Sequence, residues 1–165
     1  MKLPILDAQT LQQKAVGDPY LKVQLTLEQF AVLPMAQAQE AIAIPPSRVT
    51  PVPNMPACVL GLLNQKSRVI WVVNLAQLLG LESQSLNVQQ YNLAIIRSGK
   101  TPLGLVVPEI RGVVRLVTEA MQPMLGEILP ELTPYLRGGL IHERETLWVL
   151  DVDAIVRSPV LAGNR

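Results

Sequence analysis

Residues 146–156 read TLWVLDVDAIV, and residues 69–79 of the same chain read VIWVVNLAQLL. When the two stretches are aligned on Trp71 and Trp148, they follow one pattern. Each tryptophan precedes two aliphatic residues, then an Asn or an Asp, and then a second short apolar run. This repetition decides the fold, because it predicts one structural unit that is used twice.

Each copy of the unit is predicted to contain a buried strand, a cap and a short helix. Apolar residues stand at consecutive rather than alternate positions around each tryptophan, which predicts strands that are buried on both faces. Asn74 and Asp151 follow these strands, and their side chains suit the N-cap of a helix. The apolar residues beyond them predict short helices over 75–79 and 152–156.

The repeat extends upstream of the tryptophans. Residues 61–63 (Gly-Leu-Leu) align with residues 139–141 (Gly-Leu-Ile), with one residue of slippage before the tryptophan. In an isolated small barrel one face of a strand normally meets water, whereas two barrels packed on each other bury the second face. The duplicated unit therefore predicts two small barrels, each with one such strand.

Composition limits the classes of protein that fit. The chain has 165 residues, of which 49% are hydrophobic and 16% charged, as in a globular domain. No apolar run approaches the roughly 20 residues that span a bilayer, and the opening residues are too quickly polar for a signal peptide. The net charge of +1 is spread along the chain, which argues against nucleic acid and membrane surfaces as partners. Cys58 is the single cysteine, as expected in a reducing cytoplasm.

The rest of the chain is predicted to form short strands. Residues 1–18 contain a weak helix with Asp7 as its N-cap and are interpreted as an N-terminal extension. From Tyr20 the apolar period is two, which predicts a half-buried strand through Leu27, a turn at 28–29 and a return strand over 30–33. Further strands are predicted at 91–97, 103–107, 112–117, 136–142 and 146–150.

Two segments between these strands are less regular. Residues 36–42 fit a helix or a strand equally well. Residues 45–56 carry five prolines, which predicts an ordered loop or a sheet edge. Ser98-Gly99-Lys100 is predicted to be a hairpin turn.

The sequence offers few candidate catalytic residues. His142 is the only histidine, which excludes a histidine-rich metal site, and its place beside a predicted turn indicates a solvated side chain. Cys58 falls in an apolar stretch, which favours an inert buried thiol. Asp151 and Asp153 are a pair of carboxylates, but a capping role and a first-turn role account for them. We therefore expect no catalytic residue, metal or cofactor.

From residue 52 to residue 75 the sequence resembles the CheW-type coupling proteins of chemotaxis and their PilI-like counterparts in pilus-based motility. These proteins carry two prolines around a short loop, a glycine, an Asn-Leu-Arg-Gly turn and a strand that closes on Pro-Val-Ile-Asp-Leu. This chain has Lys66 in place of Arg, Ser67 in place of Gly, Trp71 in place of Pro and Asn74 in place of Asp. Further matches lie at 104–107, 113–116 and 150–153.

The resemblance implies a fold and a domain organisation. The fold would be mainly β, with two intertwined five-stranded SH3-like barrels and short helices. The CheW-like domain would cover residues 19–159, after the extension at 1–18 and before a C-terminal tail at 160–165.

The resemblance also implies a function without catalysis. The protein would be a cytoplasmic adaptor that holds a CheA-type histidine kinase, through the kinase's regulatory domain, against the tip of a methyl-accepting receptor. The output would be chemotaxis, phototaxis or twitching motility. By the same resemblance the partner-binding residues are Asn64, Lys66 and Arg68 in the basic turn, and Glu40 in the segment that faces the receptor.

Two other functions stay open at this level. One is a sensory barrel that binds a small molecule or a peptide, and the other is an enzyme with an unrecognised site. Aromatic residues make up only 4% of the chain, and its polar groups do not converge in the sequence, so both are less favoured than the adaptor.

Overall fold

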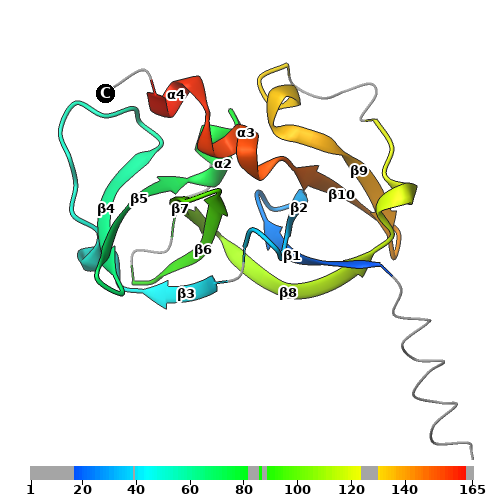
Figure 1. The fold of residues 1–165 in the computed structure, drawn as a ribbon, viewed down its shortest axis with the longest axis horizontal. Helices are drawn as coiled ribbons and strands as arrows, with labels where there is room; N and C mark the ends of the chain where they lie inside the picture. The colour runs from blue at the N-terminus through cyan, green and yellow to red at the C-terminus, as the bar shows by residue number, and fades with distance from the viewer. Residues whose placement is uncertain (1–16, 39, 82–85, 87–88, 124–129, 163–165) are drawn as a thin grey trace, which may run out of the picture.

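The computed structural model describes residues 17–38, 40–81, 86, 89–123 and 130–162. Across these residues the fold is mainly β, with 52% strand and 16% helix, and ten strands form two five-stranded sheets (Figure 1). The strands are β1 (Asp18–Gln24), β2 (Phe30–Pro34), β3 (Glu40–Ile44), β4 (Val59–Gln65), β5 (Arg68–Asn74), β6 (Tyr91–Ser98), β7 (Thr101–Val107), β8 (Glu109–Leu116), β9 (Leu136–His142) and β10 (Glu145–Leu150).

The helices in the described residues are all short. They are α2 (Leu75–Leu78), α3 (Val152–Val156), α4 (Pro159–Ala162) and three 3-10 turns, η1 (Pro46–Arg48), η2 (Thr118–Ala120) and η3 (Thr133–Tyr135). Helix α4 extends into the stretch that was expected to be a C-terminal tail. Asn74 caps α2 by accepting from the backbone N–H of Gln77 at 3.4 Å, and Asp151 caps α3 by accepting from that of Ala154 at 3.0 Å.

The two sheets interleave along the chain. One sheet has the order β8-β1-β2-β10-β9 and is called barrel A, and the other has the order β3-β6-β7-β5-β4 and is called barrel B. Barrel B is continuous in sequence and is inserted between β2 and β8 of barrel A. Each barrel contains one parallel pair, β2 with β10 and β5 with β7, and its other pairs are antiparallel.

A single bridge closes each sheet. After β3 and the turn η1, Thr50 exchanges two backbone hydrogen bonds of 2.8 and 2.9 Å with Leu62 of β4. After β8 and the turn η2, Gln122 makes the same exchange with Gly139 of β9, at 2.9 and 2.8 Å. Each bridge joins one outer strand of its sheet to the segment that follows the other outer strand, as expected for the predicted barrels.

Apolar side chains fill three cores. One lies inside barrel B and includes Ile70 and Val72, and one lies inside barrel A and includes Leu147 and Val149. The third and largest contains residues of both barrels and of helices α2 and α3, so it joins the barrels to each other.

The structure corrects the alignment of the repeat. Gly61 matches Gly138 and not Gly139. Both Gly61 and Gly138 have positive φ (145° and 157°) and lie 10 residues before their tryptophans. The residue after each glycine makes the closing bridge. The predicted shift of one residue between the two copies was wrong, because it came from aligning Gly61 with Gly139 when the structural match is the neighbouring Gly138. Residues 58–79 therefore match residues 135–156 at a constant offset.

The prediction that the tryptophan strands are buried on both faces holds for only part of β5. Val72 and Val73 face the interior of barrel B and the central core respectively, and both are buried. Toward the turn, β5 has one exposed face, since Val69 is 64% and Trp71 38% exposed. Leu27 was also wrongly placed in a strand face: β1 ends at Gln24, and Leu27 lies in the following turn with 75% exposure.

We expect Gly61→Ala to lower the free energy of unfolding by at least about 2 kcal/mol. A Cβ at Gly61 would lie 2.1 Å from the carbonyl oxygen of Thr50, and this backbone atom cannot move without breaking the closing bridge. Gly99→Ala is the matched control, because its φ is also positive (59°) but nothing lies within 4 Å. Urea unfolding of both variants measures the difference, and equal midpoints would contradict the account.

Candidate functional site

The β4–β5 hairpin of barrel B carries most of the residues that the sequence singled out. Its two-residue turn places Lys66 (φ 52°) and Ser67 (φ 64°) in the left-handed region, and Gln65 and Arg68 are paired on either side. Two consecutive positive φ values are the mark of a type I′ turn, whose twist matches that of the flanking strands. The hairpin therefore holds the basic turn in a fixed backbone conformation.

Lys66 and Glu40 meet in the structure. The Lys66 Nζ lies 3.1 Å from Oε2 of Glu40, which begins β3. The Lys66 side chain is 68% exposed and that of Glu40 27% exposed, so solvent screens the pair and its contribution to stability is about 0.2–1 kcal/mol. This ion pair links β3 to the end of β4, the two outer strands of barrel B.

Asn64 and Arg68 lie beside this pair in different roles. Asn64 is exposed, and its backbone carbonyl accepts a hydrogen bond of 3.0 Å from the Arg48 guanidinium. Arg48 supports the hairpin from η1, and this role was not predicted because nothing in the sequence spacing brings residues 48 and 64 together. Arg68 is half-buried and makes no ion pair with any residue that the structure describes.

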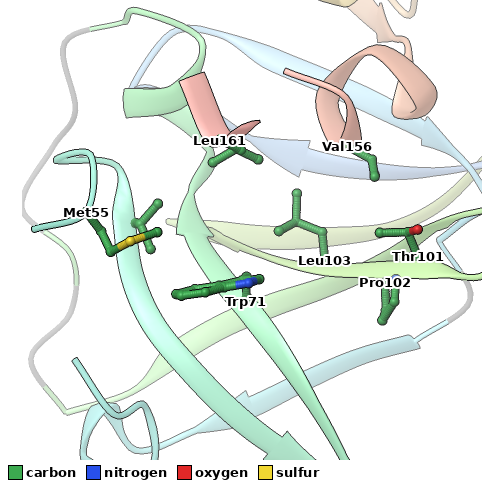
Figure 2. Close-up of a pocket in the computed structure, with 8 residues that line it drawn as sticks. Met55, Trp71, Thr101, Pro102, Leu103, Val156 and Leu161 are labelled. Atoms are coloured by element: carbon green, nitrogen blue, oxygen red, sulfur yellow. The ribbon is translucent and has the colours of Figure 1, made fainter. Parts of the chain in front are cut away.

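An apolar pocket opens beside the same hairpin. It encloses roughly 620 Å³ of space, part of it open to solvent. Figure 2 shows Trp71 on one side, facing Leu103 of β7 and Leu161 of α4. The lining residues are Met55, Val59, Trp71, Thr101, Pro102, Leu103, Val156 and Leu161, none of which is charged. Because Trp71 was expected to be buried, the sequence analysis did not predict this pocket.

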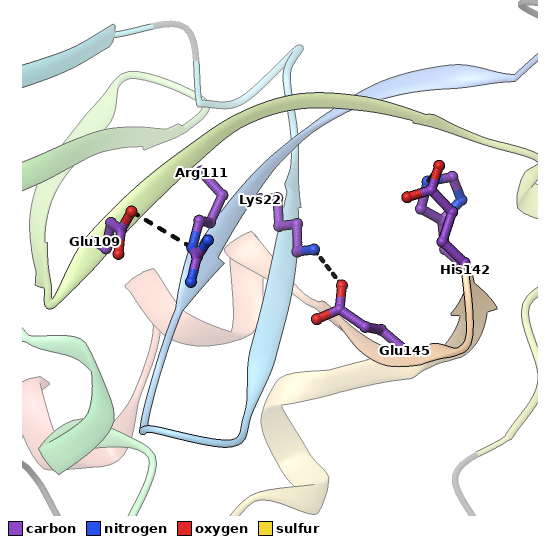
Figure 3. A network of polar contacts seen from close by, with 6 residues as sticks. Lys22, Glu109, Arg111, His142 and Glu145 are labelled. Atoms are coloured by element: carbon purple, nitrogen blue, oxygen red, sulfur yellow. Dashed lines mark hydrogen bonds and ion pairs between the residues drawn. The ribbon is translucent and has the colours of Figure 1, made fainter.

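Barrel A carries a twin hairpin with different charges. Its turn residues Glu143 and Arg144 also have positive φ, 50° and 68°. At the constant offset, Glu143 stands where barrel B has Lys66, and Glu145 stands where it has Arg68. Glu145 forms an ion pair with Lys22 of β1, so this position is engaged within its own barrel (Figure 3).

Lys22 belongs to a wider polar cluster on barrel A. The Lys22 Nζ lies 4.9 Å from the centroid of the Phe30 ring, and the Arg111 guanidinium lies 5.1 Å from it. Arg111 also approaches Glu109 at 3.6 Å, as Figure 3 shows. These contacts stabilise the side of barrel A that includes β1, β2 and β8.

The residues considered for catalysis have structural contacts instead. Cys58 is 3% exposed, and burial raises the pKa of its thiol, which keeps it protonated. Asp153 accepts hydrogen bonds from Ser98 at 2.6 Å and Gln37 at 3.0 Å, and the bond from Ser98 is the main cause that lowers the pKa of Asp153. His142 is partly exposed and lies 3.9 Å from Glu143.

Within the described ranges, no group of three or more His, Cys, Asp or Glu side chains could hold a metal ion. No helix in that part of the chain is long and apolar enough to cross a membrane.

The chain matches the model of the CheW-like domain over residues 19–160. It is 26% identical over 139 residues to chemotaxis protein CheW of Thermotoga maritima, which covers 79% of this chain and 89% of that protein. It is also 26% identical over 121 residues to protein PilI of Pseudomonas aeruginosa, which covers 73% of this chain and 65% of that protein. The crystal structure of the scaffolding protein TtCheW from Thermoanaerobacter tengcongensis has a similar fold, with a TM-score of 0.70 at 14% identity over 82% of this chain and 90% of that one.

Ser67→Gly should raise the free energy of unfolding by up to about 1 kcal/mol, because Ser67 has a left-handed backbone conformation that glycine adopts without the Cβ penalty. Urea unfolding measures the change. Ser47→Gly is the control, at an exposed position within η1 where φ is not positive. A lower midpoint for Ser67→Gly than for the wild type would show that the turn does not have this conformation.

Proposed function

Because this chain belongs to the CheW-like domain family, whose members are non-catalytic scaffolds, we propose that it couples a methyl-accepting chemoreceptor to a CheA-type histidine kinase. The family couples receptors to CheA in general. This chain is a scaffold and not an enzyme. Its proposed place of action is the cytoplasm, in chemotaxis, phototaxis or twitching motility. The observation that carries the proposal is the family match over residues 19–160, which spans both barrels.

The kinase regulatory domain is proposed to contact the β4–β5 hairpin. Lys66 is largely exposed, Asn64 is exposed, and Arg68 has no ionic partner in the described part of the chain. A rigid turn with two cations suits acidic groups on a folded partner, since its backbone loses little freedom on binding. The family resemblance implies a similar fold for the regulatory domain of the kinase, which would allow the two proteins to pack barrel against barrel.

The receptor tip is proposed to contact the side of barrel B that contains Glu40. Glu40 belongs to the outer strand β3, and Lys66 lies 3.1 Å from it. The ion pair would then lie between the two partner surfaces. A partner that draws Lys66 away leaves Glu40 without its cation, so binding on one side changes the charge presented on the other.

The apolar pocket beside Trp71 gives less support to a sensory function than the family match gives to the adaptor. The one hydroxyl that lines it belongs to Thr101, and no charged side chain reaches it. Binding sites for small molecules usually combine an apolar lining with a few convergent polar groups that fix orientation. The pocket lacks that second feature.

We expect Lys66→Glu to weaken binding of the kinase regulatory domain and to reduce its salt dependence, because the substitution brings like charges together. Stability should change by less than about 0.5 kcal/mol, as for most surface positions. Isothermal titration at two salt concentrations measures binding, and melting curves measure the fold. Arg144→Glu is the matched control, an exposed cation in the matching turn between β9 and β10 of barrel A.

A charge swap separates recognition from support of the barrel. The double variant Lys66→Glu, Glu40→Lys can rebuild the ion pair with reversed signs. If Lys66 acts by contacting the kinase, the swap leaves binding weak. If the double variant binds the kinase as tightly as the wild type, the ion pair only supports the barrel, and the proposed contact is wrong.

A further inference from the structure

The two barrels provide an internal comparison of the same strand position. Trp71 and Trp148 occupy matching places in β5 and β10, as the bulge glycines, the turns and the caps show. Trp148 is half-buried and packs against the central core. Trp71 is 38% exposed and borders an open apolar pocket. The central core thus partly covers one tryptophan of the pair, whereas the other borders an open pocket.

The exposed apolar surface continues from the pocket toward the turn. Val69 lies on the same face of β5 as Trp71, because side chains alternate along a strand, and it is 64% exposed. Leu62, the cross-strand partner of Trp71, is only half-buried. Contiguous exposed apolar surface of this kind marks an interaction site more often than single exposed residues do.

The charge at the end of this surface restricts what can bind there. Arg68 lies three residues before Trp71, about 10 Å along the strand and on its opposite face, and the exposed Lys66 follows in the turn. In barrel A the matching positions are the acidic Glu143 and Glu145, and Glu145 is already paired with Lys22. Barrel B therefore combines an open apolar pocket with a basic turn, and barrel A does not.

We propose that the Trp71 pocket receives one bulky uncharged side chain, such as Leu, Met or Phe, from the kinase regulatory domain, while a carboxylate of that domain about 10 Å away meets the basic turn. The inference rests on the proposed function, which brings the kinase to this hairpin. The apolar lining favours such a side chain over a charged one, because nothing in the pocket would compensate a buried charge. The pocket supplies a buried anchor, and the turn supplies orientation.

Fluorine NMR of the chain labelled with 5-fluorotryptophan reports both positions at once, since the chain has only two tryptophans. Trp148→Phe assigns the two resonances. On addition of the kinase regulatory domain we expect the Trp71 resonance to shift and the Trp148 resonance to stay in place. An unmoved Trp71 resonance at saturation overturns the pocket proposal.

Two variants test the energetic role of the pocket. Trp71→Ala should weaken binding of the kinase regulatory domain by at least about tenfold, as for a buried aromatic anchor. Thr101→Trp, at an exposed position on the pocket wall, should weaken it similarly by filling the space. Trp148→Ala is the matched control and should keep the affinity at temperatures where the variant is folded. Wild-type affinity for both Trp71→Ala and Thr101→Trp overturns the proposal.

The remaining outcomes identify which proposal fails. If Lys66→Glu weakens kinase binding but the Trp71 resonance does not shift, the proposed function stands and the pocket takes no part in kinase binding. Absence of kinase binding contradicts the proposed function itself. A Trp71 shift that follows a receptor tip fragment, or the concentration of this chain alone, shows a different occupant and overturns the assignment to the kinase.

Discussion

The central apolar core between the barrels is the constraint on which the structure depends. Val73 and Leu105 of barrel B share it with Leu33 and Leu150 of barrel A, and helices α2 and α3 contribute to it. Each tryptophan strand therefore needs two cores, the interior of its own barrel and the one between barrels. Because barrel B is also inserted between β2 and β8, the chain cannot form barrel A without bringing its distant halves together. The two barrels are therefore packed together through one shared core.

Duplication of the backbone with divergence of the surface suits such a scaffold. The bulge glycines, the type I′ turns and the capped helices are shared by the barrels, so their geometry is the same. Their surfaces differ: barrel B has Lys66 where barrel A has Glu143, and Trp71 borders an open pocket whereas Trp148 packs against the central core. This combination of fixed spacing and unlike surfaces would suit the two different partners of the proposed function.

The sequence predicted the elements well and the tertiary contacts poorly. Strand β9 and helix α3 have the predicted bounds, because apolar period and cap chemistry are local signals. The exposure of Trp71 was missed, since a run of apolar residues cannot show that its protein neighbours leave one face open. The ion pair between Lys66 and Glu40 could not be predicted from the sequence either, because it depends on how β3 and β4 approach each other when the barrel closes. Arg48 was missed for the same reason.

The claim that both barrels share one core is tested most directly by following their unfolding separately. Trp71 reports barrel B and Trp148 reports barrel A, so the variants Trp148→Phe and Trp71→Phe each leave one fluorophore. For each variant, urea unfolding is followed both by its remaining tryptophan and by circular dichroism of the whole chain. The account expects the two signals to give one coincident transition in both variants, as for a single cooperative unit. A tryptophan transition that separates from the circular dichroism transition, with one barrel folded while the other is not, would contradict it.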